Sequence, residues 1–106
     1  MIGSLNTTKS GIEKAHSATL DLQATMEVRA KKDSALTPKV AELSAAAEGL
    51  HTFLGLLRGH ISELVGLSAD SEDVDGMIAK ATSLTELGET HLAGYRAMSK
   101  RMRALL

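Results

Sequence analysis

The sequence contains no cysteine and no tryptophan, and apart from four histidines its only aromatic residues are Phe53 and Tyr95. Without cysteine there is no disulfide framework, no thiolate metal site and no cysteine nucleophile. Two aromatic rings are too few for a base-stacking platform or an aromatic-lined ligand pocket. These absences argue against several classes of enzyme and of nucleic-acid-binding protein.

An excess of charge of one sign is also missing, because 12 lysines and arginines oppose 13 aspartates and glutamates in 106 residues. We therefore expect neither nucleic-acid binding nor stable insertion into a membrane. No signal peptide is visible, which predicts a cytoplasmic location, although a secretion route without such a signal stays open. Phosphate-binding loops, nucleophile elbows and metalloprotease motifs are absent, so we predict that the protein is not an enzyme and needs no cofactor.

Proline is scarce, and the single Pro38 follows Thr37, a residue type that often caps the N-terminus of a helix. Residues 33–37 are therefore predicted to connect two helices, with Thr37 as the cap. A second connection is predicted after Gly66, which suits the left-handed end of a helix. The residues that can cap the following helix are Ser68, Asp70 and Ser71.

Between these breaks, apolar residues recur every three or four positions, which is typical of one face of a helix in a heptad repeat. The predicted helices cover residues 6–33, 38–66 and 71–105. Short connections place consecutive helices antiparallel, so we expect residues 1–106 to form one all-α domain, a three-helix antiparallel coiled-coil-like bundle. The alternative is an extended helical hairpin that completes its core by oligomerisation. The apolar seam of the second helix is Val40, Leu43, Ala47, Leu50, Leu54, Leu57, Ile61 and Leu64.

The seam of the third helix is interrupted at Gly88 and His91. The apolar positions keep their phase across both residues, so one continuous helix is predicted. A single histidine on a seam is most often a packed, neutral residue, and the alternative is a pH-sensitive device that sets the register.

The outer face of the second helix lacks charge, since Glu48 is the only charged residue between Leu43 and Leu57. A solvated helix face normally carries lysine, glutamate or glutamine. We therefore predict that this face docks a further helix, from a second copy or from a partner protein. The alternative is that both flanks are covered inside its own bundle. The predicted contact residues are Phe53 and Leu56 as apolar anchors, Gly55 and Gly59 as the surface of close approach, and Thr52 and Ser62 beside them.

The third helix ends with a cluster of positive charge formed by Arg96, Lys100, Arg101 and Arg103. Such charges complement the dipole of a helix C-terminus. They also suit an acidic partner, so the second hypothesis is a small regulatory or inhibitory protein, of phage or plasmid type, that binds a larger machine through its charged ends.

The third hypothesis, a metal-dependent helical-bundle enzyme, rests on histidine–glutamate pairs with three-residue spacing, which lie on one helix face as in di-iron bundles. The pairs are Glu13–His16, Glu48–His51 and, in reverse order, His60–Glu63. The first two lie beside the apolar seam or away from it, and the third helix has no matching pair. We therefore predict no metal site.

Overall fold

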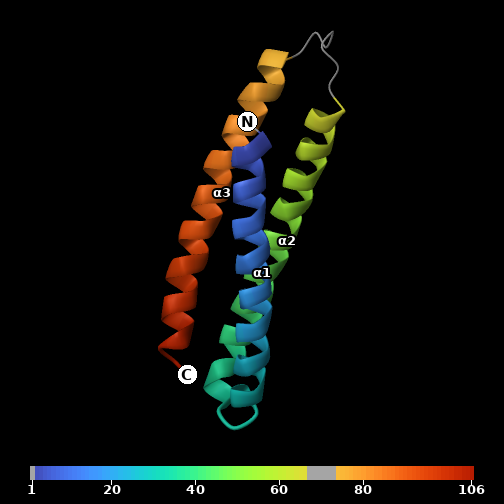
Figure 1. The fold of residues 1–106 in the computed structure, drawn as a ribbon. Coiled ribbons are helices and arrows are strands. Elements are labelled where there is room, and N and C mark those ends of the chain that lie inside the picture. The colour runs from blue at the N-terminus through green and yellow to red at the C-terminus, as the bar shows by residue number, and fades with distance from the viewer. Residues whose placement is uncertain (1, 67–73) are drawn as a thin grey trace.

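The computed structural model of the chain describes residues 2–66 and 74–106, and these form an up-down-up bundle of three long helices (Figure 1). The bundle is a rod that measures 61 × 18 × 17 Å. The predicted all-α, three-helix antiparallel architecture is thereby confirmed. The elements are α1 (Ile2–Ala30), the short 3-10 turn η1 (Ser34–Leu36), α2 (Thr37–Val65) and α3 (Val74–Arg103).

The α1–α2 connection is built differently from the predicted one. Asp33 has an extended backbone, and its carboxylate accepts a hydrogen bond from the Ala35 N–H at 3.1 Å, which caps η1. The turn then leads directly into α2, so Thr37 already has helical dihedral angles and Leu36 stands at the cap position. The prediction that Thr37 caps α2 is wrong, because a capping side chain needs an extended backbone that Thr37 does not have.

The C-terminus of α2 also departs from the sequence-based expectation. Gly66 has φ −80° and ψ −3°, in the right-handed region, and its N–H donates a hydrogen bond to the Ser62 carbonyl at 3.1 Å. The predicted left-handed conformation of Gly66 is therefore wrong, because an ordinary right-handed turn closes the last carbonyls of α2. The predicted caps Ser68, Asp70 and Ser71 lie outside the described residues.

The helix α1 is the central element of the bundle. It packs against both α2 and α3, whereas α2 and α3 contact each other less (Figure 1). Because α1 contacts both neighbours, the chain closes a core of its own, unlike the alternative extended hairpin.

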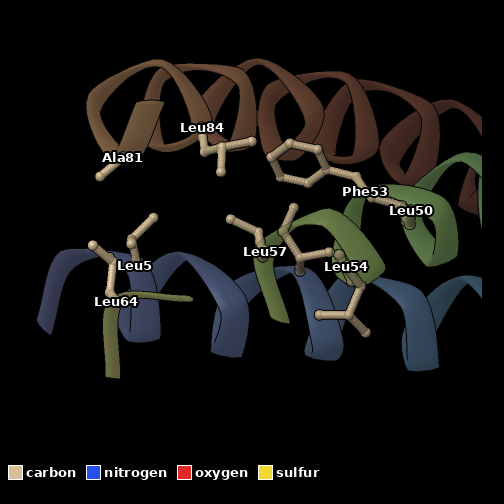
Figure 2. Close-up of a cluster of buried hydrophobic side chains, with 10 residues drawn as sticks. Leu5, Leu50, Phe53, Leu54, Leu57, Leu64, Ala81 and Leu84 are labelled. Atoms are coloured by element: carbon tan, nitrogen blue, oxygen red, sulfur yellow. The ribbon is translucent and has the colours of Figure 1, made fainter. Parts of the chain in front are cut away.

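Two buried clusters fill the bundle, and Tyr95 packs against both. The larger cluster lies toward the end of the bundle where α2 finishes, and Figure 2 shows it. The smaller cluster lies toward the α1–α2 connection and consists of Leu22, Met26, Leu43, Met98 and Met102. The larger consists of Leu5, Ile12, Ala15, Leu50, Phe53, Leu54, Leu57, Leu64, Ala81 and Leu84.

At Gly88 the backbone of α3 approaches the other two helices closely. A Cβ atom added at Gly88 would overlap Thr8 Cγ2 on α1 and would lie 3.4 Å from Phe53 Cε1 on α2. Glycine is therefore required for this approach. The helix α3 runs on through Gly88 and His91, which confirms the prediction of one continuous helix.

In the described ranges, no helix carries an apolar stretch long enough to cross a bilayer.

Candidate partner-binding face

The side of α2 that points away from the core is covered by nothing in the described chain. Gly55 and Gly59 are exposed, and a Cβ atom added at either position would meet no other atom within 4 Å. Thr52 and Ser62 are exposed one turn to either side. The Thr52 hydroxyl donates a hydrogen bond to the Glu48 carbonyl at 3.0 Å, so this side chain lies against its own helix rather than projecting outward.

Leu56 stands beside these glycines, and 57% of its surface is exposed. A leucine side chain next to two exposed glycines forms a protrusion beside a flat surface. A second helix can pack on a surface of this shape. We refer to Thr52, Gly55, Leu56, Gly59 and Ser62 as the α2 outer face.

Phe53 does not belong to this face. It is 4% exposed, and its ring lies beside α3 (Figure 2). The ring centroids of Phe53 and His91 are 4.5 Å apart. The prediction that Phe53 is an exposed anchor is wrong. The reason is that α2 has two neighbours, so it needs an apolar stripe wider than the two-row seam of a coiled coil.

The wider stripe also buries His60, which the sequence analysis did not place in the core. Ala46, Phe53 and His60 follow one another at intervals of seven, and this spacing is the signal that could have revealed a third row of core positions. His60 is 1% exposed, and its Nε2 donates a hydrogen bond to the Met77 carbonyl across the α2–α3 interface at 3.2 Å.

The edge where α2 meets α3 is closed by an ion pair at each end. Glu63 Oε2 lies 3.6 Å from Lys80 Nζ at one end, and Arg101 forms an ion pair with Glu42 at the other. The two ion pairs agree on one antiparallel alignment of α2 and α3, since moving from Glu63 to Glu42 along α2 matches moving from Lys80 to Arg101 along α3. In this alignment Gly49 lies opposite Gly94, and Leu56 lies opposite Leu87. Leu87 is 50% exposed, and a Cβ atom added at Gly49 or Gly94 would meet nothing within 4 Å.

Between the two ion pairs the edge opens into an apolar hollow of about 210 Å³. Both α2 and α3 line it, and the lining includes Gly49 and Gly94. The lining residues are Ala46, Gly49, Leu50, His91, Gly94, Tyr95 and Met98. The hollow and the α2 outer face lie on neighbouring sides of α2, and the exposed residues Glu48 and Glu63 border the outer face, one turn before Thr52 and one turn after Gly59.

The four cations of the predicted basic contact at the end of α3 have two different environments in the structure. Arg101 is engaged with Glu42 in the bundle. Arg96, Lys100 and Arg103 line a second hollow of about 380 Å³, together with Tyr95 and Ser99. Three of the four predicted cations therefore face a common depression, and the fourth holds α3 to α2.

The predicted Glu-x-x-His pairs do not build a metal cage. Within residues 2–66 and 74–106, no three histidine, aspartate or glutamate side chains gather closely enough to enclose an ion.

Compared with known proteins, the chain matches no family model, no curated protein and no solved structure. Its function therefore has to be inferred from the geometry of these surfaces alone.

Proposed function

We propose that this protein is a non-enzymatic interaction module that packs a further helix, from a second copy or from a partner protein, on the α2 outer face. The observation that carries the proposal is the open space over Gly55 and Gly59, next to the exposed Leu56.

The stability of the isolated bundle does not account for these glycines. Glycine in an exposed helix costs about 1 kcal/mol relative to alanine, and a methyl group at Gly55 or Gly59 would meet nothing within the described chain. What a surface without Cβ atoms offers is close approach of another helix backbone. Association with a helix is therefore the use that fits both positions.

The exposed leucines supply a driving force for the same contact. Leu56 and Leu87 each leave at least half of their surface in water, and full burial of a leucine side chain contributes about 1.5–3 kcal/mol. Burying the remaining half of each would contribute roughly 1 kcal/mol per residue.

The test is the molar mass of the purified protein, measured by light scattering over a range of concentrations. We expect a wild-type mass above that of a single chain, and the single-chain mass for the double variant Gly55→Glu plus Gly59→Glu, because two carboxylates would be buried in the contact. The matched control is Ala24→Glu plus Val28→Glu, two exposed positions four residues apart on α1, which we expect to associate like the wild type.

Two results would contradict the proposal. One is an assembly that the Gly55→Glu plus Gly59→Glu variant forms as readily as the wild type does. The other is a wild-type protein that stays a single chain at every concentration and binds its partner in the cell equally well with and without both glutamates.

A second candidate function is favoured by the hollow that Arg96, Lys100 and Arg103 line. Three cations around one depression suit an acidic surface on a larger assembly, as expected for a small regulatory or inhibitory protein. Reversing these three charges to glutamate tests this candidate. Loss of partner binding with unchanged helicity supports it over the α2 outer face, and unchanged binding contradicts it.

A further inference from the structure

Two histidines from different helices meet at the α1–α2 interface. The rings of His16 on α1 and His51 on α2 have centroids 5.6 Å apart, and their planes are tilted by 36°. His16 is partly buried and His51 is exposed. The pair joins one member of each of two Glu-x-x-His motifs, which run in opposite directions on the two helices.

We infer that His16 and His51 form a binding site for a divalent transition-metal ion. A metal–nitrogen distance of about 2.0–2.1 Å, extended by about 1.2 Å to the ring centre, places each imidazole centroid about 3.2 Å from the ion. Two such rings on a tetrahedral ion then lie about 5.2 Å apart, and their separation cannot exceed about 6.4 Å. The observed 5.6 Å falls between these values, so the spacing of the two rings is that of two imidazoles on one ion.

The ligand type determines the class of metal. Imidazole nitrogen suits Zn²⁺, Cu²⁺ and Ni²⁺, whereas Mg²⁺ and Ca²⁺ require oxygen ligands. For a given site of this kind Cu²⁺ binds more tightly than Zn²⁺ or Ni²⁺. In the part of the chain that the structure describes, no third histidine or carboxylate joins the pair closely enough to make a cage. The ion is therefore held by two protein ligands and keeps positions for water or for a ligand from outside the chain.

Each histidine has an acidic residue three positions earlier on its own helix, Glu13 before His16 and Glu48 before His51, and both are exposed. This spacing puts each carboxylate on the same side of its helix as the imidazole. A carboxylate that accepts the second N–H of a ligating imidazole orients the ring and makes it more basic. Glu13 pairs with Lys9 in the metal-free bundle, at a distance of 4.0 Å between Nζ and Oε1, so the two imidazoles alone are assigned as ligands.

A metal held by His16 and His51 would link α1 to α2 at mid-length, about halfway between the η1 turn and the end of α2. Since the unfolded chain does not hold the two imidazoles together, the ion would bind the native bundle preferentially and stabilise it. The site lies on the side of α2 next to α1, and His51 precedes Gly55 by one turn, so the site borders the α2 outer face but uses none of its residues.

The experiment is a calorimetric titration of the purified, metal-free protein with Cu²⁺, Zn²⁺ and Mg²⁺ at neutral pH. We expect one ion per chain for Cu²⁺ and Zn²⁺, tighter binding of Cu²⁺, and none for Mg²⁺. His16→Gln and His51→Gln should each weaken binding by at least about tenfold, since losing a direct ligand costs no less than losing an outer-shell partner. The matched control is His91→Gln, which should bind as the wild type does, because His91 lies against Phe53 on α3.

A second measurement reads the ligands directly. The electron paramagnetic resonance spectrum of the Cu²⁺-loaded protein should show coupling to two imidazole nitrogens, reduced to one in either single variant. The circular dichroism of each variant confirms that the bundle is intact. Absence of one-site Cu²⁺ binding in the wild type, or a His16→Gln variant that binds as tightly with the same spectrum, would overturn the assignment.

Discussion

The ring of Phe53 on α2 lies against the ring of His91 on α3, with centroids 4.5 Å apart and planes tilted by 32°. This contact lies next to Gly88, where all three helices approach one another, and it joins the two helices that otherwise contact each other least. Phe53 is therefore a core residue of the α2–α3 interface, while its neighbour Leu56 faces outward.

The burial of Phe53 predicts a strong contrast between two adjacent apolar positions. Phe53→Ala should lower the free energy of unfolding by about 3–5 kcal/mol, because it leaves a cavity between α2 and α3. Leu56→Ala should change it by no more than about 0.5 kcal/mol in the single chain, because the side chain is more than half exposed. Urea denaturation of both variants at low protein concentration measures the difference. Equal losses at the two positions would show that α3 does not pack on Phe53.

Two glycine-to-alanine substitutions should have opposite signs. Gly88→Ala forces a methyl group into Thr8 and against Phe53, and we expect it to destabilise the bundle by about 1–3 kcal/mol. Gly55→Ala places the same methyl group in open space, and it should stabilise the single chain by about 0.5–1 kcal/mol. Thermal unfolding of the two variants under dilute conditions compares them. A gain in stability at Gly88 would mean that the helices are further apart there than the structure shows.

His60 offers a test of the α2–α3 interface near the C-terminus of α2. His60→Ala removes a buried ring and its hydrogen bond to the Met77 carbonyl, and it should cost about 2–4 kcal/mol. His51→Ala, on the exposed side of α2, is the matched control and should stay within about 0.5 kcal/mol of the wild type in metal-free buffer. Hydrogen exchange should show the loss of protection spreading through the first turns of α3. Equal, small effects at both histidines would contradict the burial of His60.

The ion pair between Glu42 and Arg101 joins α2 to α3 at the opposite end and reports their register. A double-mutant cycle with Glu42→Gln and Arg101→Gln should give a coupling energy of about 0.2–1 kcal/mol, because the pair is exposed to water. The coupling should shrink as salt is added, since surface charges are screened. The pair Glu42 and Arg96, which does not meet in the structure, serves as the control cycle. No coupling between Glu42 and Arg101 at low salt would argue for a different register.

Periodicity was sufficient to predict the architecture, because a two-row seam such as that of α2 identifies a helix and its buried side without any knowledge of its neighbours. It could not show how wide the buried stripe is. Ala46, Phe53 and His60 lie beside the seam, and only the position of α3 decides whether this flank or the opposite one is covered. The flank with Gly55 and Gly59 was predicted to be open, and it is exposed in the structure.

Contacts between helices were the second feature that the sequence could not supply. The meeting of His16 with His51 depends on the offset between α1 and α2, and that offset is set by the conformation of the η1 turn. The cap assigned to Thr37 failed for a related reason, because the 3-10 turn gave Thr37 a helical backbone. The pattern of residue types indicates where a connection lies but not its path.

The most direct test of the central claim is the reactivity of a single cysteine on the α2 outer face, since the natural chain contains none. Ser62→Cys should react with a membrane-permeable maleimide much more slowly in intact host cells than in dilute purified protein, because a helix covers the face in the assembled state. Ala24→Cys, on the exposed side of α1, should react at the same rate in both settings. If the Ser62→Cys variant reacts in cells as fast as the Ala24→Cys variant does, the α2 outer face is not a docking surface.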